Sequence, residues 1–137
     1  MSHLSYFEKI AEKRPSIRKN HNYYWIDITK YCDYFINENC SVLEIGCGTG
    51  ELLAGLKSTN KTGIDFSPAM IEIARKNNPE IQFEVMDAAS VSFDKKFDVI
   101  IISNVVGFLP DVQEVFEKLQ HVCPSSTKVI VSYYSKL

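Results

Sequence analysis

The pattern of hydrophobic and polar positions changes at about residue 41 of the chain. Before that point apolar residues recur at helical spacing, which predicts a short amphipathic helix over residues 4–13 and a longer helix over residues 23–37. The basic and polar segment between them, residues 15–22, is expected to be a connection. The apolar stripe of the longer helix is expected to consist of Trp25, Ile28, Tyr31 and Phe35.

From residue 41 onward, short apolar runs alternate with helical patterns. The apolar runs predict strands over residues 41–45, 61–66, 81–86, 97–103 and 128–134. Helices are predicted between them, with Ser67-Pro68 and Asp111 as start signals for two of the helices. This alternation is typical of a parallel sheet whose right-handed crossovers place helices on both faces. We therefore expect one α/β domain with a doubly wound sheet.

Ligands of such sheets bind beyond the carboxyl ends of the strands, so the residues directly after each strand are candidates for a site. After Glu44 in the sequence, glycines occupy alternate positions: Gly46, Gly48 and Gly50. Glycines in this pattern allow a tight turn and a close approach of a ligand to the backbone, at the start of the next helix. Asp65 ends the second strand, where a carboxylate can accept hydrogen bonds from both hydroxyls of a ribose.

The third and fourth strands end in further polar residues. Asp87 is a candidate acceptor for an adenine amino group, and Ser103 and Asn104 follow the fourth strand. Each candidate has an alternative structural role. Asp65 would instead cap the next helix, Asp87 would be a turn residue, and Asn104 is either a ligand contact or a loop residue.

The glycine spacing differs from that of dinucleotide-binding proteins. Their fingerprint is G-x-G-x-x-G, whereas this chain has G-x-G-x-G, with Glu44 two positions before the first glycine. A carboxylate there repels a pyrophosphate, but it can orient the ammonium group of an amino-acid tail. The spacing therefore disfavours a dinucleotide-dependent oxidoreductase.

Four segments in register resemble the class I S-adenosylmethionine-dependent methyltransferases. They are VLEIGCGTG at 42–50, GIDFSPAMIEIAR at 63–75, MDA at 86–88 and FDVIIISNVV at 97–106. The resemblance covers about residues 40–134. It implies a Rossmann-like parallel sheet with strand order 3-2-1-4-5, followed in the family by an antiparallel hairpin, and S-adenosylmethionine as the cofactor, with S-adenosylhomocysteine as its product.

The resemblance also implies the site residues Glu44, Gly46, Cys47, Gly48, Asp65, Phe66, Asp87, Ala88 and Ser103. The glycine turn, with Cys47, would line the methionine and ribose side through its backbone. Glu44 and the carbonyl of Ser103 would hold the methionine end, and Asp65 the ribose hydroxyls. The adenine would lie against Phe66 (alternatively a core residue) and Asp87-Ala88. Cys47 is interpreted as a small turn residue rather than a nucleophile.

By the family pattern, residues 1–40 are expected to form a helical lid over an α/β core of residues 41–137. Cations and aromatic residues of the lid would contact the methionine carboxylate or the methyl acceptor, unless they form a solvated face: Arg14, Arg18, Lys19, Tyr23 and Tyr24. The core is expected to lack the final hairpin, which leaves the fifth strand as an edge. Two explanations remain open: a fragment of a longer protein, such as the methyltransferase half of a methyltransferase–glycosyltransferase fusion, or pairing of edge strands in a dimer.

Composition and charge limit the classes of binding partner that are expected. The chain has 137 residues, 15 basic and 17 acidic, with a net charge of −2, so it lacks the basic footprint of nucleic-acid binding. The four cysteines have no zinc-ligand spacing, and no metal site is expected. No signal peptide or membrane span is apparent, so a cytoplasmic protein is expected.

The predicted reaction is methyl transfer to a small-molecule acceptor. Transfer from a sulfonium is an in-line displacement in which proximity and orientation are the main catalytic effects, and no catalytic residue is assigned from the sequence. The [DN]PP[YFW] signature of enzymes that methylate nucleic-acid bases is absent, since Ser103-Asn104-Val105-Val106 stands in its place. The alternative is a non-catalytic S-adenosylmethionine-binding module that serves a fused or partner domain.

Overall fold

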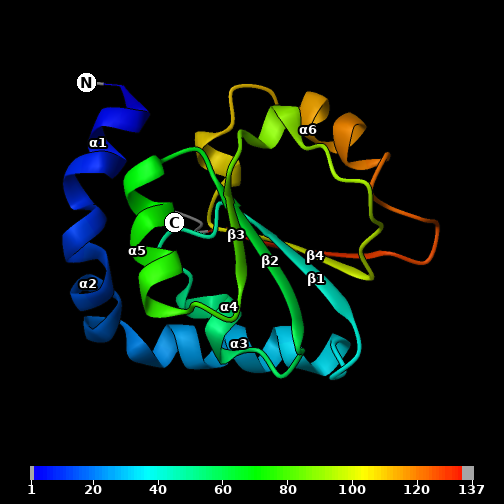
Figure 1. Ribbon diagram of the computed structural model, residues 1–137, viewed down its shortest axis with the longest axis horizontal. Helices are drawn as coiled ribbons and strands as arrows, with labels where there is room; N and C mark the ends of the chain where they lie inside the picture. The colour runs from blue at the N-terminus through cyan, green and yellow to red at the C-terminus, as the bar shows by residue number, and fades with distance from the viewer. Residues whose placement is uncertain (1, 134–137) are drawn as a thin grey trace.

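The computed structural model describes residues 2–133, and it contains a five-stranded parallel sheet with the order β3-β2-β1-β4-β5 (Figure 1). Both the fold class and the strand order agree with the prediction. The strands are β1 (Ser41–Ile45), β2 (Asn60–Asp65), β3 (Gln82–Val85), β4 (Val99–Ser103) and β5 (Lys128–Ser132). The predicted end of the fifth strand, residue 134, lies outside the described residues.

Helices cover both faces of the sheet, as the alternating pattern predicted. On one face α3 (Asn22–Phe35), α4 (Glu51–Gly55) and α5 (Pro68–Asn77) pack on side chains such as Val42 and Ile101. On the opposite face α6 (Val112–Leu119) packs on side chains such as Leu43 and Ile100 (Figure 1). The side chains of β1 alternate between the two layers, so Glu44 faces the same layer as Val42.

The helix start signals in the sequence work as predicted. The Ser67 hydroxyl accepts a hydrogen bond from the Met70 N–H at 3.2 Å, with Pro68 in the first turn of α5. The Asp111 carboxylate accepts one from the Glu114 N–H at 3.0 Å at the start of α6. These caps satisfy N–H groups that a helix leaves unpaired at its first turn.

The N-terminal segment differs from the prediction in two respects. The expected connection is helical: α1 (His3–Ile10) leads through a 3-10 turn, η1 (Ala11–Lys13), into α2 (Arg14–Asn20). Pro15 lies in the first turn of α2, where its missing N–H costs nothing.

The buried stripe of α3 is also shifted from the predicted one. Tyr31 and Phe35 are 71% and 42% exposed, whereas Cys32 is 1% exposed and joins the core with Ile36 and the partly buried Ile28. The smaller residues fit the close approach of α3 to the sheet, and the aromatic rings face outward. Within residues 2–133, no helix is both long and apolar enough to span a membrane.

Candidate active site

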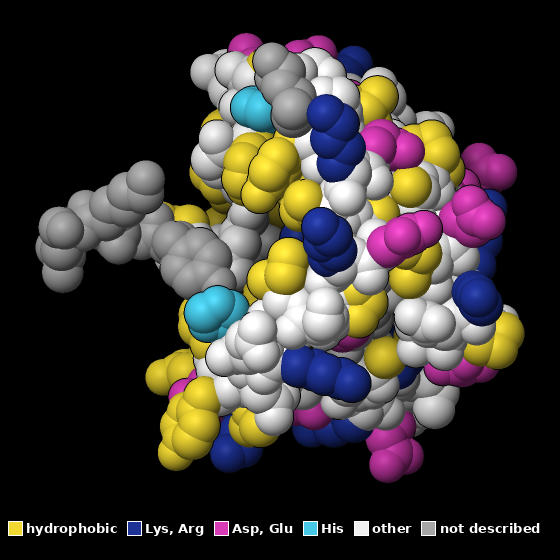
Figure 2. Space-filling view, turned by 90° about the vertical axis from the view of Figure 1, so that its left-hand side faces the viewer, with side chains coloured by type: hydrophobic (Ala, Val, Ile, Leu, Met, Phe, Trp, Pro, Cys, Tyr) yellow, Lys and Arg dark blue, Asp and Glu magenta, His cyan; other side chains and the backbone are white. Residues whose placement is uncertain are grey.

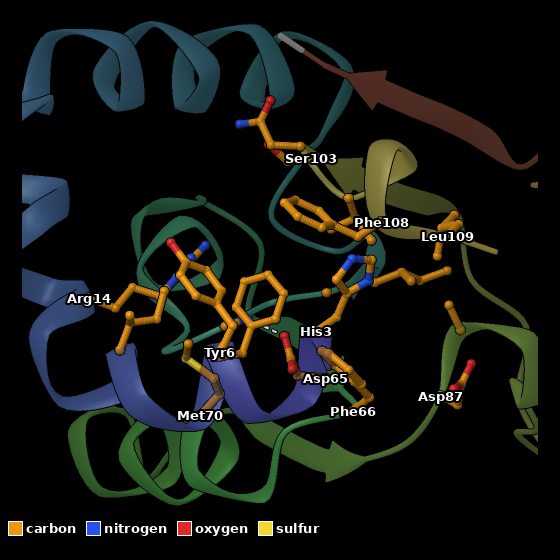
Figure 3. A pocket seen from close by; sticks show the side chains of 18 of the residues that line it. His3, Tyr6, Arg14, Asp65, Phe66, Met70, Asp87, Ser103, Phe108 and Leu109 are labelled. Carbon is orange, nitrogen blue, oxygen red and sulfur yellow. Dashed lines mark hydrogen bonds between the residues drawn. The ribbon is translucent and has the colours of Figure 1, made fainter. Parts of the chain in front are cut away.

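A cavity of about 580 Å³ lies at the carboxyl ends of the strands, and the N-terminal helices form its opposite wall (Figure 3). Two short 3-10 turns complete it on the side of the sheet, η2 (Ala88–Ser90) after β3 and η3 (Val106–Phe108) after β4. The strand ends contribute polar groups and backbone. The helices contribute aromatic, aliphatic and basic side chains. The cavity is therefore at the position that the sheet topology predicted.

The glycine turn after β1 is held against β2 by its own backbone. The N–H groups of Gly46 and Cys47 both donate to the carbonyl of Ile64, at 2.8 and 2.9 Å. Gly46 and Gly48 have φ values of 72° and 55°, which residues with a Cβ rarely adopt. A Cβ on Gly48 would stand 2.7 Å from Nε of Arg14, so the arginine lies directly over this turn.

Asp65 links the glycine turn to the start of α5. Its two carboxylate oxygens accept hydrogen bonds from the N–H groups of Gly48, at 2.9 Å, and Ser67, at 3.0 Å. Burial raises the pKa of this carboxyl above its usual value, while the two N–H donors and Arg14 lower it. Each oxygen keeps further acceptor capacity, and the side chain points into the cavity (Figure 3). The capping role and a ligand-binding role are therefore compatible.

A cluster of four charged side chains lies beside the glycine turn. Arg18 is buried, donates to Glu51 at 3.0 Å and stacks its guanidinium 3.5 Å from the ring centroid of Trp25. Glu44 is 4% exposed, and burial raises its pKa to about 8, although Arg18 and Arg14 act in the opposite direction. Among the described residues, nothing hydrogen-bonds to Oε2 of Glu44 or to Nε of Arg14. Buried polar atoms without partners are rare and point to a missing ligand or water.

The sequence of the domain agrees with this geometry. A family model described as "Methyltransferase domain" matches residues 42–125, more than half of the chain. The chain belongs to the class I methyltransferase family. Family membership makes S-adenosylmethionine its cofactor and excludes the dinucleotide-dependent oxidoreductase as a reading of the glycine motif.

Two curated methyltransferases illustrate the similarity. The chain is 32% identical over 94 residues to malonyl-[acyl-carrier protein] O-methyltransferase of Bacillus anthracis, a match that covers 64% of this chain and 35% of that protein. It is 37% identical over 82 residues to trans-aconitate 2-methyltransferase of Escherichia coli, a match that covers 57% of this chain and 32% of that protein. The matches thus span about a third of the length of these relatives.

Solved structures share the fold of this methyltransferase domain. The DhpI–SAM–HEP complex superposes with a TM-score of 0.79 at 21% identity, over 99% of this chain and 69% of that one. The plantazolicin methyltransferase BpumL, in complex with a monoazolic desmethylPZN analog and S-adenosylhomocysteine, superposes with a TM-score of 0.68 at 24% identity, over 93% of this chain and 51% of that one. These likenesses establish the fold.

The structure brings most of the predicted site residues of the methyltransferase domain to the cavity. Seven line it: Gly46, Gly48, Asp65, Phe66, Asp87, Ala88 and Ser103. Glu44 lies behind this lining, and Cys47 turns its side chain into the core, 2.9 Å from where a Cβ of Gly63 would be. Burial raises the pKa of the Cys47 thiol well above its usual value, which agrees with a structural role. Asp87 also caps η2, where its carboxylate accepts the Ala89 N–H at 2.8 Å.

The predicted lid residues are divided between the cavity and the surface. Arg14 and Arg18 line the cavity, whereas Tyr23 is 86% exposed and Lys19 is also exposed. On the face formed by the N-terminal helices, basic side chains are interspersed with apolar and uncharged ones and have acidic neighbours (Figure 2). The fifth of the predicted residues, Tyr24, exchanges hydrogen bonds with the amide of Asn104, at 3.1 and 3.2 Å.

The aromatic wall of the cavity was not predicted from the sequence. Phe7 of α1 contacts Phe66 and Phe108 edge to face, with ring centroids 5.7 and 5.3 Å apart, and His3 contacts Phe108 at 5.5 Å. These rings come from segments that are more than a hundred residues apart in the sequence. The regular amphipathic pattern of α1 indicated a buried face, but not what that face would cover.

The backbone conformation of Asn104, whose role the sequence leaves open between a ligand contact and a loop residue, is the second feature that the sequence does not predict. Asn104 has a φ of 58°, the one positive φ of a non-glycine residue within residues 2–133. Its N–H donates to the carbonyl of Ser132 at 2.8 Å, and its side chain lines the cavity next to Ser103. Asparagine tolerates this conformation better than most residues, and such strain is concentrated at functional sites.

Proposed function

We propose that this chain binds S-adenosylmethionine in the cavity and transfers its methyl group to a small-molecule acceptor. The observation that carries the proposal is the conjunction of three features in one cavity. They are a positive-φ glycine turn, a buried carboxylate (Asp65) with spare acceptor capacity, and two buried, unpartnered polar atoms on Glu44 and Arg14.

These groups fit the cofactor part by part. The amino-acid tail brings an ammonium and a carboxylate, which complement the unpartnered Glu44 and Arg14. Asp65 can accept the two ribose hydroxyls without giving up its bonds to Gly48 and Ser67. The aromatic wall around Phe66 suits a planar purine.

When bound, the cofactor supplies an activated methyl group. The residues of the chain have to hold both reactants in line and exclude water, which contributes about 7–11 kcal/mol in well-oriented reactions. The helices α1 to α3 close over the strand ends and are suited to the exclusion of water. Asn104 and its partner Tyr24 lie beside Ser103 at the end of β4, which β2 and β1 separate from β3, the strand that Asp87 follows. They are suited to contact the acceptor.

A small acceptor is supported by three observations. The net charge is −2, basic side chains do not form a continuous band on the face in Figure 2, and aromatic side chains are part of the cavity lining. Trans-aconitate, named as the acceptor of one relative, is a small organic acid.

The test is methyl transfer from radiolabelled S-adenosylmethionine to a fractionated small-molecule extract. We expect label in a low-mass product and S-adenosylhomocysteine in equal amount, and neither with Gly48→Val. Binding of the cofactor with no labelled product, even from a longer chain that contains this domain, would instead favour the non-catalytic module.

A further inference from the structure

Glu44 is a buried carboxyl at the centre of the sheet, with an oxygen that no described residue contacts by a hydrogen bond. The charged and titratable groups that act on it come from each element packed around it. They are Arg14 and Arg18 on α2, Glu51 on α4, Asp65 on β2, Cys32 on α3 and Cys47 in the glycine turn.

Neither arginine fully compensates the negative charge that an ionised Glu44 would carry. Arg18 donates to Glu51 at 3.0 Å and stacks on Trp25, so its hydrogen-bonding is directed elsewhere. Arg14 lies over Gly48, with its Nε unpartnered. A buried carboxylate without donors is strongly disfavoured, so Glu44 retains its proton at neutral pH, in line with a pKa raised by burial to about 8.

The amino-acid tail of the cofactor changes this balance, because it brings an ammonium group to the glycine turn that directly follows Glu44. An opposite charge within about 4–6 Å favours the ionised form of a carboxyl. This step rests on the function proposed above.

We propose that binding of S-adenosylmethionine or S-adenosylhomocysteine expels one proton from Glu44 to the solvent. In the free chain Glu44 carries the proton. In the complex it is a carboxylate paired with the ligand ammonium, and the proton is taken up by the buffer. The affinity of the domain for its cofactor is therefore linked to pH.

The direction of the linkage follows from the proton balance. Because the complex holds one proton less than its separate components, a higher pH favours binding. The dissociation constant should fall about tenfold per pH unit between pH 6 and 7 and level off near pH 8, where free Glu44 is already half ionised.

The test is calorimetric titration of the chain with S-adenosylhomocysteine at pH 7, in phosphate and in Tris. The two buffers differ greatly in ionisation enthalpy, so the difference between the observed enthalpies gives the number of protons released. We expect close to one proton for the wild type and for Glu72→Gln, a control on the exposed face of α5. We expect none for Glu44→Gln, which has nearly the same size and no proton to lose.

A second ligand keeps the test independent of that variant's folding. 5′-Methylthioadenosine has the same nucleoside but no amino-acid tail, so its binding to the wild type should release no proton. Equal enthalpies of S-adenosylhomocysteine in both buffers, or equal proton release with the two ligands, would overturn the proposal for Glu44. The absence of any binding, both to this chain and to a longer chain that contains it, would instead overturn the proposed function.

Discussion

Replacement of Asp65 tests the proposed ribose site and has two separable consequences. The carboxylate is expected to accept both ribose hydroxyls, and hydrogen bonds to a charged group contribute about 1.5–3 kcal/mol each. Asp65→Ala should therefore weaken binding of S-adenosylhomocysteine by about 3–6 kcal/mol, or about 10²- to 10⁴-fold.

The same substitution should also destabilise the fold. The N–H groups of Gly48 and Ser67 lose the acceptors that lie at 2.9 and 3.0 Å in the structure. Unpaired buried donors cost about 1–3 kcal/mol each, and water entering from the cavity would reduce this to about 2 kcal/mol in all. Asp65→Asn, which retains one carbonyl oxygen, should lose less stability but still most of the affinity.

The assay combines urea denaturation with calorimetric binding at a temperature where every variant is folded. The exposed Asp94→Asn is the matched control, and it should change neither quantity. Competition by adenosine and 2′-deoxyadenosine adds a specific readout, since the wild type should prefer adenosine and Asp65→Ala should not. Near-normal affinity of the folded Asp65→Ala variant would refute the assignment of the ribose site.

Three further predictions concern the charged cluster and the glycine turn. Gly48→Val should abolish cofactor binding measured by calorimetry, because its Cβ would meet Arg14 and its φ of 55° is strained for valine; unchanged affinity would argue against the turn as the binding surface. Arg14→Met should weaken S-adenosylhomocysteine about 10- to 100-fold but leave 5′-methylthioadenosine nearly unaffected, and an equal loss for both would exclude Arg14 as the carboxylate partner. The pKa of Glu44, about 8 in the fold, is above its unfolded value, so its contribution to stability is complete at low pH and is lost as the pH rises to 8. Without cofactor, the melting temperature of Glu44→Gln minus that of the wild type should therefore increase as the pH rises from 5 to 8. A difference that does not change with pH would contradict this.

The core of the fold follows from local patterns. The strands are short apolar runs between turn residues, and the caps at Ser67 and Asp111 are encoded within four residues. The sequence does not predict the helix α2, because its polar, basic composition and its proline are typical of loops, although proline is favoured in a first helical turn. Hydrophobicity alone predicts that Tyr31 and Phe35 lie on the buried face of α3, whereas the space beside the sheet suits the smaller Cys32.

At the site, too, some features follow from local sequence patterns and others depend on tertiary packing. The glycine turn and Asp65 follow strands directly, so topology alone brings them together. Other contacts at the site join segments that are distant in the sequence: Tyr24 with Asn104, Arg18 with Glu51, and His3 with Phe108. They depend on how the N-terminal helices dock, which no local pattern encodes. The unpartnered atoms of Glu44 and Arg14 likewise became evident only in three dimensions.

The central claim is that this cavity binds S-adenosylmethionine, and calorimetric titration of the purified chain with S-adenosylmethionine, S-adenosylhomocysteine and NAD tests it most directly. We predict micromolar binding of the first two ligands and none of NAD. The absence of binding by the first two, both to this chain and to a longer chain that contains it, would contradict the account, as would binding of NAD.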